Sequence, residues 1–196
     1  MQKIALIPIG EAGTPIAQKL QALLADVQTD VIGRTDVGTQ WAHYDAFVFI
    51  GAMGICVRTI APYIKDKHTD PAVVCIDSLG RHAISVLSGH VGGANELTAT
   101  IAAALDAAPV ITTQSDNAGL WALDTLAQRF GWAVADHREQ KGMNDLITAF
   151  VRQEPTALFM DVPTEHFLLI FDAYGFPESL VVTGKPRINA YVICCH

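Results

Sequence analysis

The sequence has 196 residues, of which 51% are hydrophobic and 17% charged, and a formal net charge of −7. This length accommodates one large domain or two small ones, with enough apolar residues for a hydrophobic core. The acidic balance argues against a general nucleic-acid-binding protein, because neutralising phosphates requires a surplus of Lys and Arg. No apolar run reaches membrane-spanning length. From the charge balance and the lack of such a run, we expect neither a nucleic acid nor a membrane as a partner.

Apolar runs alternate with glycine turns and helical patterns through most of the chain. The expected strands cover residues 3–9, 46–50, 72–76, 82–87 and 109–113, with a short one at Val31-Ile32. The expected helices cover residues 15–24, 55–64 and 95–105. This alternation predicts a three-layer α/β domain over residues 1–135.

Local signals refine this pattern. The segment Asp77–Arg81 places a glycine-containing turn between two β-rich runs, which predicts a hairpin and hence a mixed, mostly parallel sheet. Thr14 is a candidate N-cap, with Pro15 in the first helical position. Pro62 lies inside the helical pattern 55–64 and predicts a kink.

The character of the sequence changes beyond Trp132. Before this point, capping oxygens at Ser115–Asn117 predict a helix that Gly131 ends. After it, a helix is expected over residues 144–152, followed by short apolar runs separated by glycine and proline. These runs cover residues 157–160, 167–171, 180–182 and 191–193. They predict a smaller α+β unit over residues 136–196.

The four cysteines show neither metal-ligand nor redox spacing. Cys56 and Cys75 lie in apolar runs, which predicts buried thiols. Cys194 and Cys195 are adjacent, and adjacent cysteines rarely form a disulfide with each other because disulfide geometry is strict. We therefore expect a protein of the reducing cytoplasm, and no metal site is predicted from His, Cys or Asp spacing.

The connections between 58 and 90 differ in charge from the rest of the chain. They contain four basic and three acidic residues in a protein of net charge −7, and three of the seven histidines. A less negative site suits an anionic small molecule, although ordinary variation in charge explains the pattern equally well. The glycine cluster 89–93 precedes a helical pattern, where unpaired N–H groups can bind an anion.

Four motifs in this order resemble a known family. They read GICVR at residues 54–58, KDKHTDPAVV at 65–74, LSGHVGGANEL at 87–97 and PVITT at 109–113. The pattern is similar to the N-terminal domain of the CbiG proteins of cobalamin biosynthesis. The resemblance extends more weakly to about Ala135 and then into a middle region like residues 136–196.

The resemblance implies a cobalt-precorrin 5A hydrolase of the anaerobic route to vitamin B12. In that reaction water opens a δ-lactone on a cobalt-containing, ring-contracted tetrapyrrole, and acetaldehyde is released. The cobalt belongs to the substrate, so no separate cofactor is implied. The implied partners are this tetrapyrrole and a C-terminal CbiG domain or a fused cobalamin-biosynthesis enzyme, because the family continues beyond the part that resembles this sequence. A homodimer is also compatible with the sequence.

Lactone hydrolysis requires a base for water and anchors for the substrate's carboxylate arms. His90 is the first candidate base, since histidine titrates near neutral pH and this one lies in a glycine loop. Asp66 and Glu96 are alternative catalytic residues. Lys65 and Lys67, together with Arg58, would pair with the acetate and propionate arms.

The remaining candidates for substrate binding come from the same loops. They are Gly54, Asp70, Ser88, Gly89, Gly92, Gly93 and Asn95. The backbone N–H groups of residues 92–95 would bind a carboxylate or an oxyanion. Asp66 or Asp70 would orient a lysine or the histidine. Ser88 is not expected to be a nucleophile, because its surroundings lack the G-x-S-x-G pattern.

Each of these residues also has a structural explanation. His90 can simply hydrogen-bond its loop, Lys65 and Lys67 can be solvated surface charges, and Asp70 before a proline is typical of a turn. We expect residues 51–58, 65–70 and 88–96 to meet on one rim of the sheet, beyond the carboxyl ends of strands.

Two other functions are compatible with these residues. One is a corrinoid-binding module without catalysis, and the other is an unrelated nucleotide-binding α/β domain. Acetaldehyde release by the 196-residue chain would support the hydrolase. A change in corrinoid absorbance without turnover would support the binding module, and tight nucleotide binding would support the third function.

Overall fold

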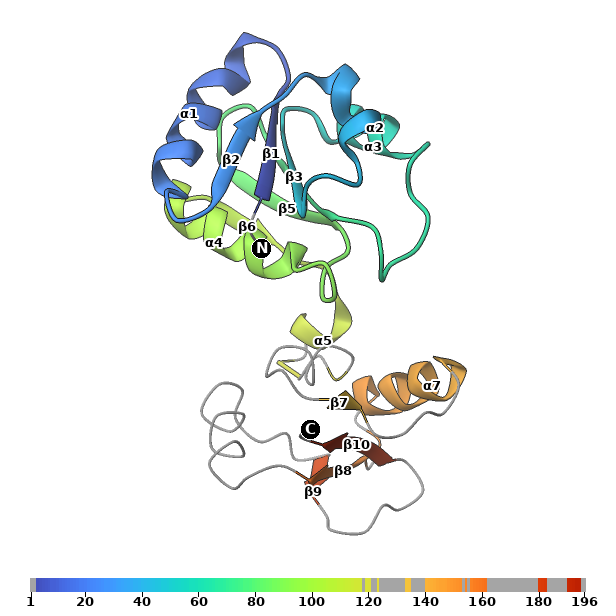
Figure 1. Ribbon diagram of the computed structural model, residues 1–196. Helices are drawn as coiled ribbons and strands as arrows, with labels where there is room; N and C mark the ends of the chain where they lie inside the picture. The colour runs from blue at the N-terminus through green and yellow to red at the C-terminus, as the bar shows by residue number, and fades with distance from the viewer. Residues whose placement is uncertain are drawn as a thin grey trace. The chain divides into compact units, whose positions relative to one another are not determined.

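The computed structural model describes residues 3–117, 119–120, 123, 133–134, 140–152, 154, 156–161, 180–182 and 190–194 (Figure 1). Its contacts divide the chain into two compact units, Met1–Thr112 and Thr113–His196. This division falls earlier than the expected boundary after residue 135. It lies where it does because the last strand of the first sheet ends at Val110.

The first unit is built on a six-stranded sheet with the order β2-β1-β3-β4-β5-β6. Its strands are β1 (Lys3–Pro8), β2 (Gln28–Val31), β3 (Ala46–Ile50), β4 (Ala72–Ile76), β5 (His82–Leu87) and β6 (Ala108–Val110). Only β4 and β5 pair antiparallel, and the other neighbours are parallel. The predicted mixed, mostly parallel sheet is therefore confirmed, although β2 begins earlier and β6 is shorter than expected.

Helices cover both faces of this sheet and make the domain three-layered. In Figure 1, α1 (Thr14–Leu23) and α4 (Ala94–Leu105) lie on one side, and α2 (Val37–Gln40) and α3 (Met53–Ile60) lie on the other. Short 3₁₀ turns, η1 (Glu11–Gly13) and η2 (Arg34–Asp36), precede α1 and α2.

The central strands are buried on both faces because their sequences are continuously apolar. Every residue of β3 and β4 is buried. Alternate residues point to opposite helical layers, so Val48 and Val74 contact the α1–α4 side while Phe47 and Phe49 contact the α2–α3 side.

The predicted buried thiols are confirmed at Cys56 and Cys75, which lie on α3 and β4. A hydrogen bond with Cys75, together with burial, raises the pKa of the Cys56 thiol. These two cysteines therefore belong to the core on the α3 side of the sheet.

Two predicted helix signals are wrong in detail. Gly13, not Thr14, is the N-cap of α1, and Thr14 is the first helical residue. A Cβ on Gly13 would stand 2.9 Å from the carbonyl oxygen of Ile50, so a glycine is needed where α1 meets β3. Pro62 does not kink α3, because the helix ends at Ile60.

The second unit contains α5 (Gln114–Asn117), α7 (Gln140–Val151) and a four-stranded sheet with the order β7-β10-β8-β9. The strands are β7 (Ala133–Val134), β8 (Thr156–Asp161), β9 (Leu180–Val182) and β10 (Ala190–Cys194). These elements confirm the helix expected near 144–152 and three of the expected apolar strands. The run 167–171 and most of the helix expected from Ser115 to Phe130 lie outside the described residues. None of the helices that the structure describes is long and apolar enough to cross a membrane.

Asp77 closes the hairpin between β4 and β5. Its carboxylate accepts the backbone N–H groups of Leu79 at 2.8 Å, Arg81 at 3.0 Å and His82 at 2.7 Å. The Nδ1 atom of His82 lies 3.2 Å from the same carboxylate. Burial acts to raise the pKa of Asp77, but these hydrogen bonds outweigh it and lower the pKa below its usual value.

We expect the hairpin to lose stability in acid. Because the folded-state pKa of Asp77 is lowered, its contribution is present above the unfolded-state pKa of about 4 and is lost as the pH falls through the folded value. The variant D77N should be less stable than wild type at neutral pH and should lose less stability between pH 5 and pH 2. Urea unfolding at each pH measures this. The exposed Asp26 provides the control D26N, and an equal acid dependence in D77N and wild type would contradict the role of Asp77.

Candidate functional site

The candidate residues lie at two edges of the first sheet. We name the edge where β1, β3 and β4 begin the amino edge, and the edge where they end the carboxyl edge. β3 and β4 are parallel, with Ile50 opposite Ile76. β5 runs the other way, with Leu87 opposite Val73. The loop after β5 therefore lies at the amino edge, and the turn after β3 lies at the carboxyl edge.

This arrangement shows that the single rim expected from the sequence is wrong. The Lys65–Asp70 loop precedes β4 and the Ser88–Gly93 loop follows β5, so both lie at the amino edge. Gly51 follows β3 at the carboxyl edge, where its N–H donates to the carbonyl of Ile76 at 2.7 Å. The hairpin reverses β5, and this reversal separates the loop after β5 from the turn after β3.

Gly54 and Arg58 belong to α3, which begins at the carboxyl edge. Arg58 is exposed, and its Nη1 atom lies 3.3 Å from the place of a Cβ on Gly54. The guanidinium therefore folds back over the first turn of its own helix, as helical side chains commonly do. This placement does not bring Arg58 together with the two lysines of the Lys65–Asp70 loop.

Asp70 organises the Lys65–Asp70 loop from within. Its side chain is buried, with a relative exposure of 6%. One carboxylate oxygen accepts the backbone N–H groups of Lys65 at 2.8 Å and Asp66 at 2.9 Å. The other accepts the indole N–H of Trp41 at 3.4 Å. The carboxylate thus binds the protein itself, and the predicted substrate contact by Asp70 gains no support from its geometry.

The same loop turns its other side chains outward. Lys65, Asp66, Lys67 and His68 are all exposed. Asp66 also accepts the backbone N–H of His68 at 2.8 Å, which tightens the turn. Two lysines are therefore held on a short, internally bonded loop, where they can reach an anionic ligand from solvent.

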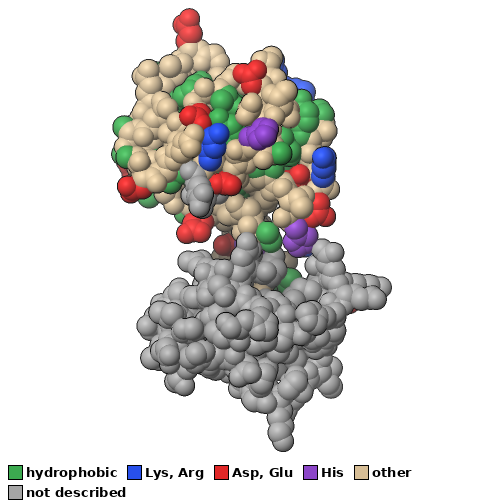
Figure 2. Space-filling model, in the orientation of Figure 1, with side chains coloured by type: hydrophobic (Ala, Val, Ile, Leu, Met, Phe, Trp, Pro, Cys, Tyr) green, Lys and Arg blue, Asp and Glu red, His purple; other side chains and the backbone are tan. Residues whose placement is uncertain are grey.

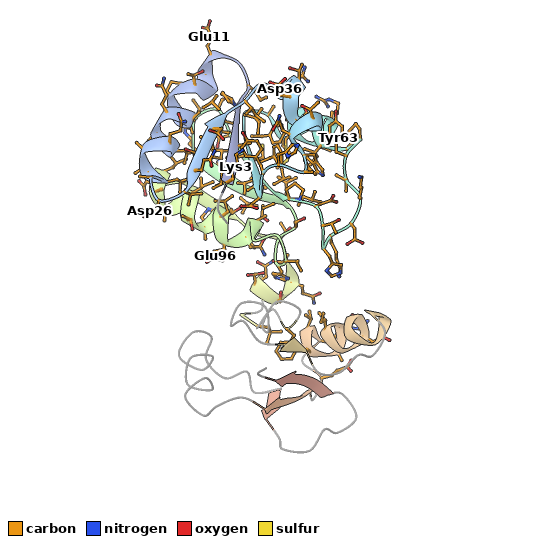
Figure 3. The ribbon with its side chains drawn as sticks, in the orientation of Figure 1. Lys3, Glu11, Asp26, Asp36, Tyr63 and Glu96 are labelled. Carbon is orange, nitrogen blue, oxygen red and sulfur yellow. The ribbon has the colours of Figure 1, made fainter. Side chains whose placement is uncertain are left out.

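Trp41 supports this loop from the α2 side. Its ring stacks on Phe47, with centroids 5.1 Å apart, and lies 6.1 Å from the ring of Tyr63. Tyr63, labelled in Figure 3, lies against α2, where a Cβ on Gly38 would clash with its ring. Trp41 was not among the residues expected from the sequence, because no local motif connects it with Asp70, 29 positions away.

The Ser88–Gly93 loop is bonded to itself and to the neighbouring loop. Ser88 has a left-handed backbone, with φ of 56°. Its hydroxyl donates to the carbonyl oxygen of Asp70 at 2.9 Å. This bond fixes a conformation that is uncommon outside glycine and joins the two loops of the amino edge.

The backbone N–H groups at the start of α4 have partners within the loop. Gly93 donates to the carbonyl of His90 at 3.0 Å, Ala94 to that of Ser88 at 3.1 Å, and Asn95 to that of Gly89 at 3.0 Å. These three donors are therefore not open to a carboxylate or an oxyanion. The anion-binding role predicted for them is wrong, because the glycines let the loop fold onto its own helix.

Asn95 and the glycines of this loop act as its frame. Asn95 is buried at 6% exposure, and its Oδ1 atom accepts the hydroxyl of Ser85 at 2.7 Å. The Asn95 side chain also lies 2.8 Å from the place of a Cβ on Gly89. A Cβ on Gly92 would stand 2.5 Å from the Cβ of Ser88. Side chains at these glycines would therefore force the loop apart.

The three candidate catalytic residues lie on the two joined segments. His90 is partly exposed and opens the turn that Gly93 closes. Glu96 is exposed on the first turn of α4 (Figure 3), and Asp66 is exposed on the other loop. In the view of Figure 2, acidic and basic side chains are interspersed over the coloured part of the surface, so charge does not gather into one patch on the side that is shown. Among the described residues, no group of three or more His, Cys, Asp or Glu side chains could hold a metal ion.

Comparison with known families places this site in context. A family model named Cobalamin synthesis G N-terminal matches residues 36–116, which include both loops of the amino edge. A second model, named Cobalamin biosynthesis central region, matches residues 121–171. The chain belongs to the CbiG family. The resemblance of its sequence motifs to this family is thereby confirmed.

Two named relatives match this CbiG chain over part of their length. The cobalt-precorrin-5A hydrolase of Salmonella typhimurium is 50% identical over 150 residues, covering 76% of this chain and 42% of the relative. The cobalt-precorrin-5A hydrolase of Priestia megaterium is 57% identical over 89 residues, covering 45% of this chain and 24% of the relative. The chain therefore spans less than half the length of these relatives.

The fold of the chain has a solved counterpart. The crystal structure of a cobalamin biosynthesis protein G homolog from Sulfolobus solfataricus matches with a TM-score of 0.57 at 23% sequence identity. The match covers 98% of this chain and 59% of that chain. At this identity the comparison supports the α/β fold.

We expect the glycine at position 92 to be required for the loop to close. In the variant G92A the new Cβ would stand 2.5 Å from the Cβ of Ser88 and 2.9 Å from its carbonyl oxygen. Overpacking of this kind typically costs about 1–3 kcal/mol. Urea unfolding should therefore show a lower midpoint for G92A, while V91A, at the neighbouring position, should stay near wild type. An unchanged midpoint for G92A would show that the loop does not close in this way.

Proposed function

We propose that this chain carries the tetrapyrrole-binding and catalytic residues of a cobalt-precorrin-5A hydrolase in anaerobic cobalamin biosynthesis. Its substrate would be a cobalt-containing, ring-contracted tetrapyrrole, whose δ-lactone is opened by water with release of acetaldehyde. The identity of 50% over 150 residues to a protein of that name supports this reaction. The observation that carries the proposal is the bond between Ser88 and Asp70, which joins the histidine-bearing loop to the lysine-bearing loop.

The proposed chemistry begins with water and a neutral histidine. His90 removes a proton from the water that attacks the lactone carbonyl, and the acyl C–O bond then breaks. This step leaves a carboxylate and a hydroxyl on the substrate. The hydroxyl then gives up its proton to a base and becomes the carbonyl oxygen of acetaldehyde as the adjacent C–C bond breaks. The electron pair of that bond stays with the macrocycle, whose carbon takes up a proton. Asp66 and Glu96 are the other proposed bases, since both are exposed on the same two segments.

Substrate anchoring is assigned to Lys65 and Lys67. Both are exposed on a loop whose backbone Asp70 holds in place. Ammonium groups in such a position can pair with the carboxylates of the acetate and propionate arms. The proposal makes no use of Gly54 and Arg58 at this site, because α3 begins at the opposite edge of the sheet.

The second function that an observation favours is tetrapyrrole binding without turnover. The chain spans 42% of the Salmonella relative, so groups that complete the reaction can belong to the remainder of such a protein. Incubation of the 196-residue chain with the cobalt-containing substrate separates the two functions. Acetaldehyde release supports the hydrolase, and a change in visible absorbance without acetaldehyde supports the binding module.

We expect His90 to act on the rate. The variant H90Q keeps a polar side chain but removes the proton acceptor, so single-turnover acetaldehyde release should fall on the order of 10²-fold or more. Binding of the tetrapyrrole, measured by absorbance titration, should stay within a few-fold of wild type. The exposed His43 provides the control H43Q, which should match wild type in both measurements. If H90Q turns over at the wild-type rate, His90 is not the base, and Asp66 or Glu96 takes its place in the proposal.

We expect Lys67 to act on binding instead. A peripheral anchor contacts the ground state and the transition state alike, so K67A should weaken binding with a smaller effect on the chemical step. Loss of one exposed charge pair corresponds to roughly a two- to five-fold change in affinity. Titration and single-turnover rates on K67A measure the two effects, with the exposed Lys19 providing the control K19A. A rate loss in K67A as large as in H90Q would contradict the anchoring role.

A further inference from the structure

Asp70 connects three segments that are distant in the sequence. Its carboxylate accepts the indole N–H of Trp41, which lies 29 positions away. The same carboxylate accepts two N–H groups of its own loop, and its carbonyl oxygen accepts the hydroxyl of Ser88, 18 positions further on. One buried residue is thus bonded to Trp41 beside α2, to the Lys65–Asp70 loop (the lysine loop) and to the Ser88–Gly93 loop (the histidine loop).

These bonds reach the proposed reactive groups through short lengths of backbone. The N–H groups of Lys65 and Asp66 are fixed directly, and Lys67 is the next residue. Ser88 is fixed with φ of 56°, and His90 follows two residues later. Because catalysis depends on placing groups within fractions of an ångström, a change at Asp70 would move both the anchor and the base.

We infer that Asp70 is a positioning residue of this site, which holds the lysine loop and the histidine loop in one register without touching the substrate. The inference rests on the proposed function. It extends the orienting role that the sequence allowed for Asp70 and replaces the substrate contact predicted for that residue. Among the described residues, N–H donors and not basic side chains surround its carboxylate. Such donors fix direction as well as distance, which is the property a positioning residue needs.

Three substitutions remove different parts of this arrangement. D70N preserves the shape of the side chain but has only one oxygen. If that oxygen accepts the two backbone N–H groups, the amide NH₂ faces the indole N–H of Trp41, and two donors then meet without an acceptor. S88A removes the bond to the histidine loop. W41F removes the indole N–H and keeps a ring that can stack on Phe47. Thr69 is exposed in the same loop, and T69A serves as the matched control.

The kinetic test is a double-mutant cycle on the full chain. D70N should raise the KM for the tetrapyrrole about ten-fold and lower kcat, whereas S88A should lower kcat about ten-fold with little change in KM. If both act through one link, the double variant should lose less in kcat than the product of the single losses. Losses that multiply, or a D70N variant that matches T69A, would overturn the inference.

A second measurement does not depend on turnover. Amide hydrogen exchange on the free chain should show faster exchange of residues 88–95 in D70N and in W41F than in T69A, although neither substitution lies in that segment. If the wild-type chain releases no acetaldehyde, the proposed catalysis fails while this coupling can still be observed. If D70N does not fold, W41F carries the same test. Unchanged exchange of residues 88–95 in a folded D70N or W41F would overturn the coupling.

Discussion

The antiparallel pairing of β4 with β5 determines where the candidate site lies. In a wholly parallel sheet, the loops after β3 and β5 would lie at the same edge and form one rim. Here the hairpin closed by Asp77 returns the chain along β4, with Leu87 opposite Val73. The loop after β5 therefore meets the loop that enters β4, and their contact through Ser88 and Asp70 follows from this reversal.

The glycine-rich loop has a different purpose from the anion-binding loops that it resembles in composition. In those loops, successive N–H groups point at a ligand. In this one, the N–H groups of Gly93, Ala94 and Asn95 return to carbonyl groups of residues 88–90. Gly92 lets the loop come close to Ser88, and the left-handed backbone of Ser88 is held by its own hydroxyl. The glycines therefore make the loop compact and do not open it to an anion.

Much of this fold follows from local signals in the sequence, and the arrangement of the site does not. Strands β3 and β4 are continuous apolar runs that leave no alternative to burial, and the turn at Asp77–Arg81 specifies the hairpin between β4 and β5. The N-cap at Gly13 depends on a close contact of the folded chain, since a Cβ there would stand 2.9 Å from the carbonyl oxygen of Ile50. The bond between Trp41 and Asp70 has no local signature at all, because a buried acceptor can take its donor from any part of the sequence.

Burial separates the candidate residues into two classes that the sequence could not distinguish. Asp70 and Asn95 are each 6% exposed, and their side-chain oxygens accept hydrogen bonds from the loop and the strand around them. Lys65 and Lys67 are exposed, and His90 is partly exposed, on the segments that those two residues hold. A buried polar group must find its partners within the protein, because leaving it unpaired is costly. The polar residues of these motifs therefore divide into buried residues that hold the loops together and exposed or partly exposed residues that solvent reaches.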